Sequence, residues 1–414
     1  MNLAVDDCFI HDRDRLRHDE ALRIIRERIE PAVGTEIVPL AQALGRVLAG
    51  DVRAPRPIPA HTNAAVDGYA YAHRDVRDEP MRISTRILAG DAPLPLESGT
   101  AARIMTGAAL PAGADTVAMQ EDCVPTDSVV RLPSLKPGAN VRSAGEDVAA
   151  NGVVARSGAR LSPPLLATIA STGTGLVSVR NRLRIALFST GTELLAPGSE
   201  FREGAVYDSN SVMLQTLVAD ARFDVTVLPT LADRAGDVRR ALAQAAEAHD
   251  AVVTSGGASK GEEDHILAAL DTLGKRHLWQ LAVKPGRPML MGQIGPVPVI
   301  GVPGNPVAAL VCGLLYLRPL LDRLAGAEWR EPMRYAAPAA FDLRSKPDRR
   351  EFLRGWIETR EGVPHAVKYA RDGSGLISGL VAATGLIEIP EETERVAFGQ
   401  AVAFLPFAEL GMTT

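Results

Sequence analysis

The chain of 414 residues is longer than one ordinary domain, and 46% of its residues are hydrophobic, which is enough for several buried cores. Its net charge of −5, with both signs interspersed along the sequence, excludes a general nucleic-acid or anionic-membrane binder. Basic groups that carry a function must therefore be concentrated in a local site.

The three cysteines, Cys8, Cys123 and Cys312, are widely spaced and form no CxxC pair, which indicates a reducing compartment. The first residues are acidic and lack the basic and apolar regions of a signal peptide. The longest apolar run, residues 307–317, is shorter than the roughly 20 residues that a bilayer requires. We therefore expect a cytoplasmic protein that binds neither a membrane nor nucleic acid.

Two helices are predicted before the first β-rich region. Residues 14–30 carry apolar side chains at helical spacing on one face, and Pro31 ends the pattern. A shorter helix is expected at about 39–49. Further along, Ser162 followed by Pro163 is typical of a helix start, and this helix should reach about residue 171.

From residue 52 to about 145 the sequence changes to short alternating runs separated by Pro- and Gly-rich connections, which predict a small β-rich lobe. Short strands return from about residue 331, separated by Asp-Gly and Pro turns, and they predict a compact C-terminal β domain. The clearest strands of the lobe are residues 82–88, 116–120 and 129–132.

Residues 182–325 alternate apolar strands with helical stretches. Because parallel neighbours need a crossover connection, this alternation predicts a doubly wound parallel sheet with helices on both faces. The fold class is therefore α/β multidomain. The predicted strands are residues 183–188, 225–228, 251–254, 278–283 and 297–302, and the predicted helices are residues 210–221, 236–249, 264–273 and 306–324.

Each predicted strand of this sheet runs into a loop rich in Gly, Ser, Thr or charged residues. Open α/β sheets bind ligands along the carboxyl edge of their strands, where glycine permits close approach and amides at helix starts receive anions. The five loops are residues 189–193, 231–233, 255–264, 284–288 and 303–306.

Charged side chains give these loops the chemistry of a site for a phosphorylated ligand and Mg²⁺. Glu193, Asp233 and Asp264 supply oxygen ligands of the kind that bridge Mg²⁺ to phosphates. Lys284 and Arg287 supply positive charge for anionic groups. Taken singly, each motif is more often a tight turn or a solvated charge. Five such loops on one edge favour a site.

The ordered set of motifs resembles the molybdopterin molybdenumtransferase (MoeA) family, which includes the E domain of gephyrin. The matching segments in the second half are residues 189–194 (STGTEL), 207–210 (YDSN), 255–264 (SGGASKGEED), 284–288 (KPGRP) and 301–307 (GVPGNPV). Those in the first half are residues 65–70 (AVDGYA), 103–108 (RIMTGA) and 145–147 (GED). The resemblance extends from about residue 12 to about residue 410.

The resemblance implies an elongated homodimer with four domains per chain, some of them discontinuous in sequence. Other molybdenum-cofactor assembly proteins and apo-molybdoenzymes are implied contacts. The implied division is an N-terminal helix (1–30) that packs with the molybdopterin-binding α/β domain (182–325), a linker domain (31–51 and 147–181), a β-rich lobe (52–146) and a C-terminal β domain (326–414).

The resemblance also implies a reaction. In a cleft between the α/β domain of one subunit and the lobe of the other, molybdenum passes from molybdate to the dithiolene sulfurs of adenylyl-molybdopterin, and AMP is released with the help of Mg²⁺. Thr106 and Asp147 would reach this cleft from the partner's lobe or its border. The implied catalytic residues are Asp147, Glu193, Asp264, Lys284 and Arg287, and the implied metal ligands are Glu193, Asp233 and Asp264. The implied cofactor-binding residues are Thr106, Ser189, Thr190, Gly191, Asp208, Asn210, Ser255, Gly256, Gly257, Ser259, Pro303, Gly304, Asn305 and Pro306.

Three positions depart from the family pattern, and each removes charge or a hydrogen-bond donor from the implied site. Thr62 stands where an aspartate is usual, Gln280 where a lysine or arginine is usual, and Ala308 where a serine or threonine is usual. Two alternatives therefore stay open: a degenerate paralogue that binds pterin or a partner without turnover, and a related pterin or nucleotide adenylyltransferase.

Overall fold

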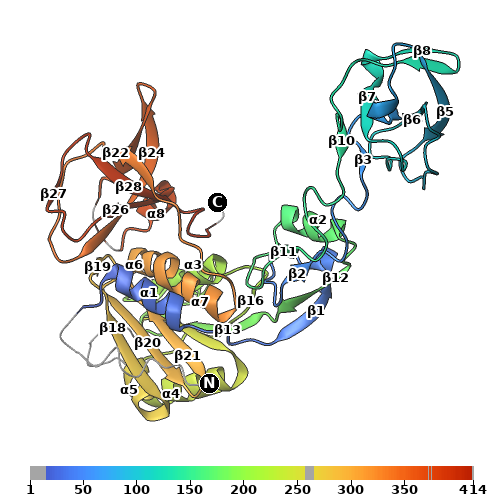
Figure 1. The fold of residues 1–414 in the computed structure, drawn as a ribbon. Coiled ribbons are helices and arrows are strands. Elements are labelled where there is room, and N and C mark those ends of the chain that lie inside the picture. The colour runs from blue at the N-terminus through green and yellow to red at the C-terminus, as the bar shows by residue number, and fades with distance from the viewer. Residues whose placement is uncertain (1–14, 257–264, 372, 374, 413–414) are drawn as a thin grey trace.

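The computed structural model describes residues 15–256, 265–371, 373 and 375–412. Figure 1 shows an elongated molecule in which the C-terminal domain lies on the α/β domain, and a slender connection leads from there to a separate lobe at the far end. Among the described residues, no helix is both long and apolar enough to cross a membrane.

The α/β domain is built on one six-stranded sheet. In spatial order its strands are β16 (Phe223–Val227), β13 (Leu183–Ser189), β17 (Ala251–Ser255), β21 (Val297–Val302), β20 (Pro288–Ile294) and β18 (Lys275–Gln280). The first four are parallel, whereas β20 runs antiparallel to both of its neighbours.

The sheet is therefore mixed, and the expectation of a wholly parallel sheet was wrong for β20. This strand was missed because residues 288–302 contain two apolar strands separated only by Gly295-Pro296. Gly295 has φ +57, so a two-residue turn can reverse the chain there without a helical crossover. The α/β class itself is confirmed.

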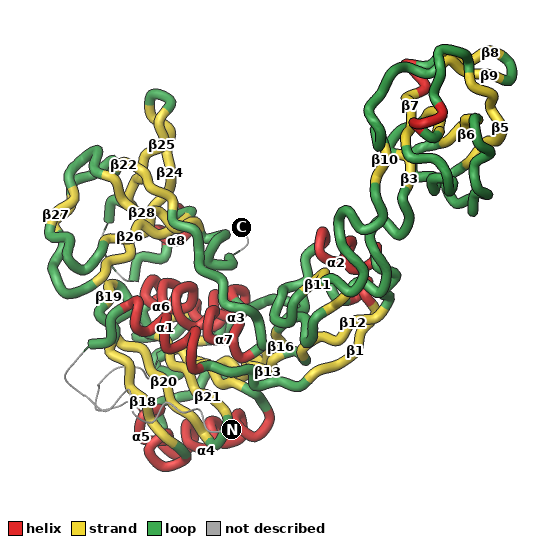
Figure 2. Tube along the Cα trace, viewed as in Figure 1, coloured by secondary structure: helices red, strands yellow, loops and turns green. Residues whose placement is uncertain are grey.

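Helices cover both faces of this sheet (Figure 2). Alternate residues of β13 divide between them, with Ile185 in one core and Phe188 in the other. The first face carries α1 (His18–Arg28), α3 (Ser209–Leu217), α6 (Pro306–Cys312), a π-helical turn (Gly313–Leu317) and α7 (Arg318–Leu324). The second face carries α4 (Ala235–Ala248) and α5 (His265–Leu273).

A small connecting region follows α1. It contains two antiparallel pairs, β1 (Thr35–Pro39) with β12 (Leu176–Arg180) and β2 (Val52–Arg53) with β11 (Val153–Ala155), together with α2 (Pro163–Ser171). The helix expected at 39–49 was wrong, because only one 3-10 turn, Leu40–Gln42, forms there. Gly45 at φ +75 takes a left-handed conformation that ends helices.

The lobe holds a six-stranded sheet of short strands. Their order is β7 (Thr116–Met119), β4 (Gly68–Tyr71), β6 (Thr100–Ile104), β5 (Met81–Ile87), β9 (Val129–Arg131) and β8 (Val124–Thr126). At its base, β3 (Asn63–Ala64) pairs with β10 (Val141–Arg142), and single 3-10 turns occur at His73–Asp75 and Gln120–Asp122.

The C-terminal domain shares its sheet with the α/β domain. Its order is β19 (Val283–Lys284), β24 (Arg350–Arg360), β26 (Gly385–Ile389), β28 (Ala401–Pro406) and β22 (Tyr335–Pro338), with β25 (Val363–Lys368) also paired to β24. A separate pair, β23 (Leu343–Arg344) with β27 (Arg395–Val396), and α8 (Ser378–Ala382) complete it. Because β19 belongs to the loop after β18, this shared sheet fixes that loop against the C-terminal domain.

Candidate functional site

The loops at the carboxyl ends of the parallel strands are tied to one another by backbone hydrogen bonds. The amide of Thr190 donates to Ser255 O at 3.1 Å, and the amide of Gly191 donates to Leu231 O at 3.0 Å. The amide of Gly256 in turn donates to Val302 O at 3.2 Å. Loops that are distant in sequence therefore form one continuous rim.

This rim encloses a cavity of about 630 Å³, which we call the edge pocket. Most of the predicted cofactor-binding residues line it, although Ser189 lies beneath the lining and is only 1% exposed. The predicted residues that line it are Thr190, Gly191, Glu193, Asp208, Asn210, Asp233, Ser255, Gly256, Pro303, Gly304, Asn305 and Pro306.

Asn210 lines the edge pocket at the start of α3. Its side-chain amide donates to Ser255 Oγ at 2.8 Å and to Gly304 O at 2.7 Å, so it joins three loops. Its Oδ1 is buried and has no hydrogen-bond partner among the described residues. A buried acceptor of this kind is costly unless something donates to it, so Oδ1 is suited to an N–H or O–H group of a ligand.

Gly256 allows two loops of the pocket to approach closely. It has φ +86, and a Cβ at this position would lie only 2.8 Å from the carbonyl oxygen of Thr190. Any other residue would therefore push the loops apart and strain the backbone. The glycine predicted as a ligand-approach residue is also required by the packing of the rim.

Among the described residues, three carboxylates line the same pocket. Asp233 is half-buried, and its Oδ2 accepts from the Thr192 amide at 3.0 Å, which links the loops after β13 and β16. Glu193 is exposed on the loop beside it. Asp208 has a structural task as well, because its side chain accepts from the Ser211 amide at 3.0 Å and caps α3.

Asp264, Gly257 and Ser259 lie outside the described residues, so their roles stay predictions. His265, the residue after Asp264, lines the edge pocket. Within the described part of the chain, no group of three or more His, Cys, Asp or Glu side chains is arranged to hold a metal ion. Of the three predicted metal ligands, Glu193 and Asp233 are described by the structure, and Asp264 is not.

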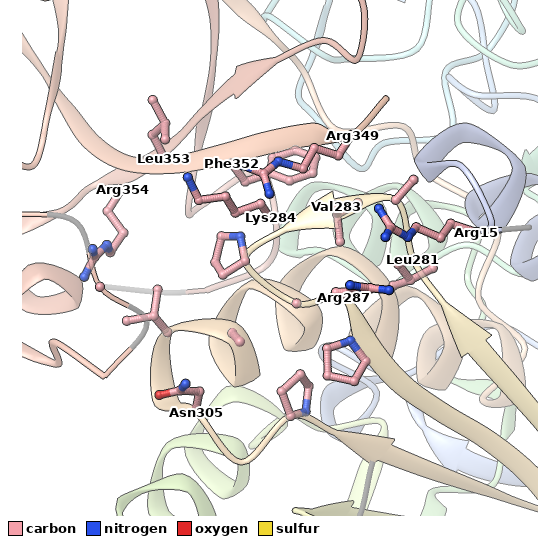
Figure 3. A pocket seen from close by; sticks show the side chains of 18 of the residues that line it. Arg15, Leu281, Val283, Lys284, Arg287, Asn305, Arg349, Phe352, Leu353 and Arg354 are labelled. Atoms are coloured by element: carbon pink, nitrogen blue, oxygen red, sulfur yellow. The ribbon is translucent and has the colours of Figure 1, made fainter. Parts of the chain in front are cut away.

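Lys284 and Arg287 line a second cavity of about 490 Å³, which we call the cationic pocket (Figure 3). It lies between the loop after β18 and the start of β24, so its walls come from both the α/β domain and the C-terminal domain. The basic residues among its lining are Arg15, Lys284, Arg287, Arg349, Arg354 and Lys368.

The sequence analysis missed the four basic residues that lie outside the loop after β18. Arg349 and Arg354 belong to the basic cluster DRREFLRG at the start of β24, which was a visible signal. That cluster has no motif spacing of its own, and only the pairing of β19 with β24 carries it to the loop. Glu351, which is 2% exposed between these arginines, was missed for the same reason.

Two of the three departures from the family pattern lie at the cationic pocket. Ala308 lines it, and Gln280 accepts a hydrogen bond from Arg287 Nη2 at 3.4 Å. The third, Thr62, lies in the lobe, where its hydroxyl accepts from the Ala144 amide at 3.2 Å. Gln280 thus gives Arg287 a neutral acceptor where a second cation is usual.

The two pockets adjoin each other. Pro288, Pro303 and Asn305 line both of them. One side of this composite cleft presents carboxylates, hydroxyls and side-chain amides, and the other presents basic side chains. A ligand with separate anionic and metal-binding groups can therefore extend from one pocket into the other.

Neither cysteine in the described part of the chain is suited to nucleophilic chemistry. Burial raises the pKa of Cys312 to about 12 and that of Cys123 to about 11, so both stay protonated near neutral pH. Cys312 packs under the cationic pocket, where its thiol donates to Gly286 O at 3.4 Å.

Thr106 and Asp147 lie apart from both pockets. Thr106 is exposed on the lobe, where its amide and hydroxyl both donate to Asp67 Oδ1 at 2.7 Å, and these bonds hold the pKa of Asp67 below its usual value. Asp147 is exposed near the base of the lobe, with its amide bonded to Ile58 O at 3.0 Å. Figure 1 shows the lobe at the opposite end of the molecule from the α/β domain, so one chain does not bring these residues to the pockets.

Comparison with known proteins agrees with this architecture along the whole chain. Three family models match in order: the MoeA N-terminal region (domain I and II) at residues 16–173, a probable molybdopterin binding domain at 186–323, and the MoeA C-terminal region (domain IV) at 336–407. A molybdopterin molybdenumtransferase of Haemophilus influenzae is 34% identical, with 95% of this chain and 98% of the relative aligned. The chain belongs to the MoeA family.

Other MoeA proteins support this membership. Molybdopterin molybdenumtransferase 2 of Mycobacterium tuberculosis is 35% identical over 87% of this chain and 92% of its own length. The crystal structure of the molybdopterin biosynthesis MoeA protein from Pyrococcus horikoshii superposes with a TM-score of 0.82 at 29% identity, covering 95% of this chain and all of that chain. The resemblance seen in the sequence motifs is thus confirmed, and so is the multidomain MoeA architecture.

Proposed function

We propose that this MoeA protein transfers molybdenum from molybdate to adenylyl-molybdopterin and releases AMP. The observation that carries the proposal is the pair of adjoining pockets with opposite chemical character. Relatives named molybdopterin molybdenumtransferase align with most of the chain, which supports the same reaction. Neither an adenylyltransferase nor a non-catalytic binder has comparable support.

The edge pocket suits the pterin and nucleotide part of the substrate. The hydroxyls of Thr190 and Ser255 can donate to phosphate oxygens, and the buried Oδ1 of Asn210 can accept from a ring nitrogen or amino group. Its volume of about 630 Å³ lies in the range usual for cofactor sites.

The donor set of the edge pocket fits Mg²⁺. Glu193 and Asp233 are hard oxygen ligands, and Mg²⁺ is usually held by one or two carboxylates together with substrate phosphates. When bound, the ion would supply positive charge to the phosphate linkage of the nucleotide. Asp264 is proposed as a third ligand from the sequence pattern alone.

The cationic pocket suits molybdate. The substrate is a dianion that must approach a negatively charged phosphate linkage, so fixed positive charges are needed to overcome their repulsion. Lys284 and Arg287 from one domain and Arg349 and Arg354 from the other supply these charges. Preorganised charge of this kind needs no covalent protein nucleophile, which agrees with the two protonated cysteines.

We further propose a homodimer in which each site is completed by the lobe of the other subunit. Thr106 and Asp147 lie far from the pockets of their own chain, yet they match family motifs that belong to the site. The division into an N-terminal helix, linker domain, lobe, α/β domain and C-terminal domain at the boundaries given above is part of this proposal. So are a cytoplasmic location and contacts with apo-molybdoenzymes.

The direct test is to mix purified protein with adenylyl-molybdopterin, Mg²⁺ and molybdate and to follow AMP. Release of AMP that depends on molybdate, together with molybdenum bound to pterin, is the expected result. Incorporation of AMP from ATP would instead indicate an adenylyltransferase. Tight pterin binding with no AMP release would indicate a paralogue without turnover.

A further inference from the structure

Glu351 is a buried carboxylate directly behind the lining of the cationic pocket, where it bonds to the lining residues Lys284 and Arg349. It lies on β24 directly opposite Lys284 of β19 and is only 2% exposed. Neither Glu351 nor β24 belongs to any of the motifs that mark the site in the sequence. A buried carboxylate is costly unless cations and hydrogen bonds satisfy it, so its surroundings indicate what it does.

Each oxygen of Glu351 is engaged by a cation of the pocket. Oε2 accepts from Lys284 Nζ at 3.2 Å, and Oε1 accepts from Arg349 Nη2 and Nε at 2.9 and 3.2 Å. Lys284 belongs to the α/β domain and Arg349 to the C-terminal domain. One carboxylate therefore fixes two cations from two domains, at the place where the domains share a sheet.

We propose that Glu351 is a positioning residue for the oxyanion in the cationic pocket. It holds Lys284 and Arg349 at a fixed separation and lowers the positive charge of the pocket by one unit. The anion is then bound in one place without being bound too tightly to react. This inference rests on the proposed function only in naming molybdate as the anion.

Replacing the carboxylate by an amide affects binding and turnover in opposite directions. Glu351→Gln removes a negative charge near a dianion, so the attraction between pocket and anion increases. At the same time, the amide nitrogen of glutamine cannot accept, so one of the two cations loses its partner and moves. Misplaced groups lower turnover even when binding is strong. A residue that only stabilised the fold would not separate these two effects.

The experiment compares Glu351→Gln and Glu351→Asp with Glu388→Gln as the matched control. Glu388 is also buried, at 5% exposed, and it accepts from Arg334 Nε at 2.7 Å and Arg350 Nη1 at 2.9 Å. None of these three residues lines either pocket. Glu388→Gln therefore removes a buried carboxylate from between two arginines of the C-terminal domain without changing the lining of the pocket.

Sodium molybdate binding is measured by equilibrium dialysis at low ionic strength, and AMP release is measured on the same preparations. Glu351→Gln should bind molybdate about three- to tenfold more tightly, since a repelling charge is removed. Its kcat for AMP release should fall about tenfold or more, because the cations are misplaced. Glu351→Asp should restore the wild-type affinity, and Glu388→Gln should change neither quantity.

Unchanged or weaker molybdate binding in Glu351→Gln would overturn the proposal, and so would an equal effect in Glu388→Gln. If Glu351→Gln does not fold, Glu351→Asp decides, because it keeps the charge but shortens the side chain. Glu351→Asp should then show wild-type affinity with a reduced kcat, and wild-type values of both would overturn the proposal. If the wild-type protein releases no AMP at all, the proposed function fails, while the dialysis comparison still decides the role of Glu351.

Discussion

The edge pocket and the cationic pocket adjoin each other, yet they are built in different ways. The edge pocket is lined mainly by segments that follow the strands of one sheet, and it carries carboxylates and hydroxyl groups. The cationic pocket is assembled from two domains and is lined by basic side chains with one buried acid behind them. A single fold thus keeps carboxylates and basic side chains apart at neighbouring positions.

This separation has a chemical consequence. Exposed carboxylates placed among the basic side chains would compete with an anion for them, whereas the buried Glu351 lies behind the lining and leaves the pocket open to the anion. With the groups separated, the two substrates can be held side by side while their negative charges face different partners. The first prediction concerns the acidic side, where the largest effect is expected.

Glu193→Gln should lower the rate of AMP release about a hundredfold or more, because a metal ion at a phosphate linkage contributes several kcal/mol to the barrier. The thermal unfolding midpoint should stay close to that of the wild type, since the side chain is exposed. Glu200→Gln is the matched control, because Glu200 is exposed in the same connection between β13 and α3 but lines neither pocket. Wild-type turnover in Glu193→Gln would show that Glu193 is only a solvated surface charge.

The two pockets also differ in how much of each could be predicted from the sequence, and the reason is physical. Most of the polar residues that line the edge pocket among the described residues had been predicted as site residues, because each motif follows its own strand and parallel strands end at one edge. Half of the cationic pocket was not predicted, because Arg349 and Arg354 reach Lys284 only through packing between domains. Such packing leaves no local pattern in the sequence.

The same reasoning applies to the fold. Amphipathic α4 and the strands β13 and β21 were found within a residue or two, because their period is set by burial on known faces. Strand β20 was missed where a two-residue turn replaced a crossover, and a helix was wrongly expected where Gly45 takes a left-handed conformation. In both cases a glycine in a left-handed conformation, Gly295 or Gly45, sets the path of the chain, and the apolar pattern around it does not reveal this.

The second prediction tests whether the site also needs a second chain. Thr106→Ala and Glu193→Gln should each be poorly active alone, yet mixing them should restore about a quarter of the wild-type activity, because half of the dimers are hybrids with one intact site of two. AMP release is measured after partial unfolding and refolding, and differently tagged subunits establish the exchange. If exchange is demonstrated and no activity returns, the site is contained within one chain.

The third prediction sharpens the division between the pockets. Arg287→Gln should weaken molybdate binding about tenfold through loss of one cation near a dianion, with little effect on AMP binding in Mg²⁺. Asp233→Asn should weaken AMP binding in Mg²⁺ and have little effect on molybdate binding. Arg276→Gln is the control for the lost charge, because Arg276 pairs with Asp271 at 3.1 Å and lines neither pocket. Equal effects of both site variants on both ligands would show that the two pockets act as one.

The smallest expected effect concerns two departures from the family pattern, Thr62 and Gln280. Gln280 lies beside Arg287, whereas Thr62 lies in the lobe at the other end of the molecule. The two residues can therefore meet only across a dimer. Gln280→Lys alone adds a cation beside Arg287, and Thr62→Asp alone adds an unpaired acid. If the two residues face one another, the double variant should release AMP faster than the two single variants predict.

A double-mutant cycle on AMP release measures this coupling directly. We expect an interaction energy of about 0.5–1 kcal/mol, which is typical of a partly exposed ion pair. Repeating the cycle with Thr272→Lys in place of Gln280→Lys provides the control, because Thr272 is exposed on α5 and lines neither pocket. That second cycle should be additive. Additivity in both cycles would mean that this chain lost the acid and the cation independently, and that the lobe of one subunit does not face Gln280 of the other.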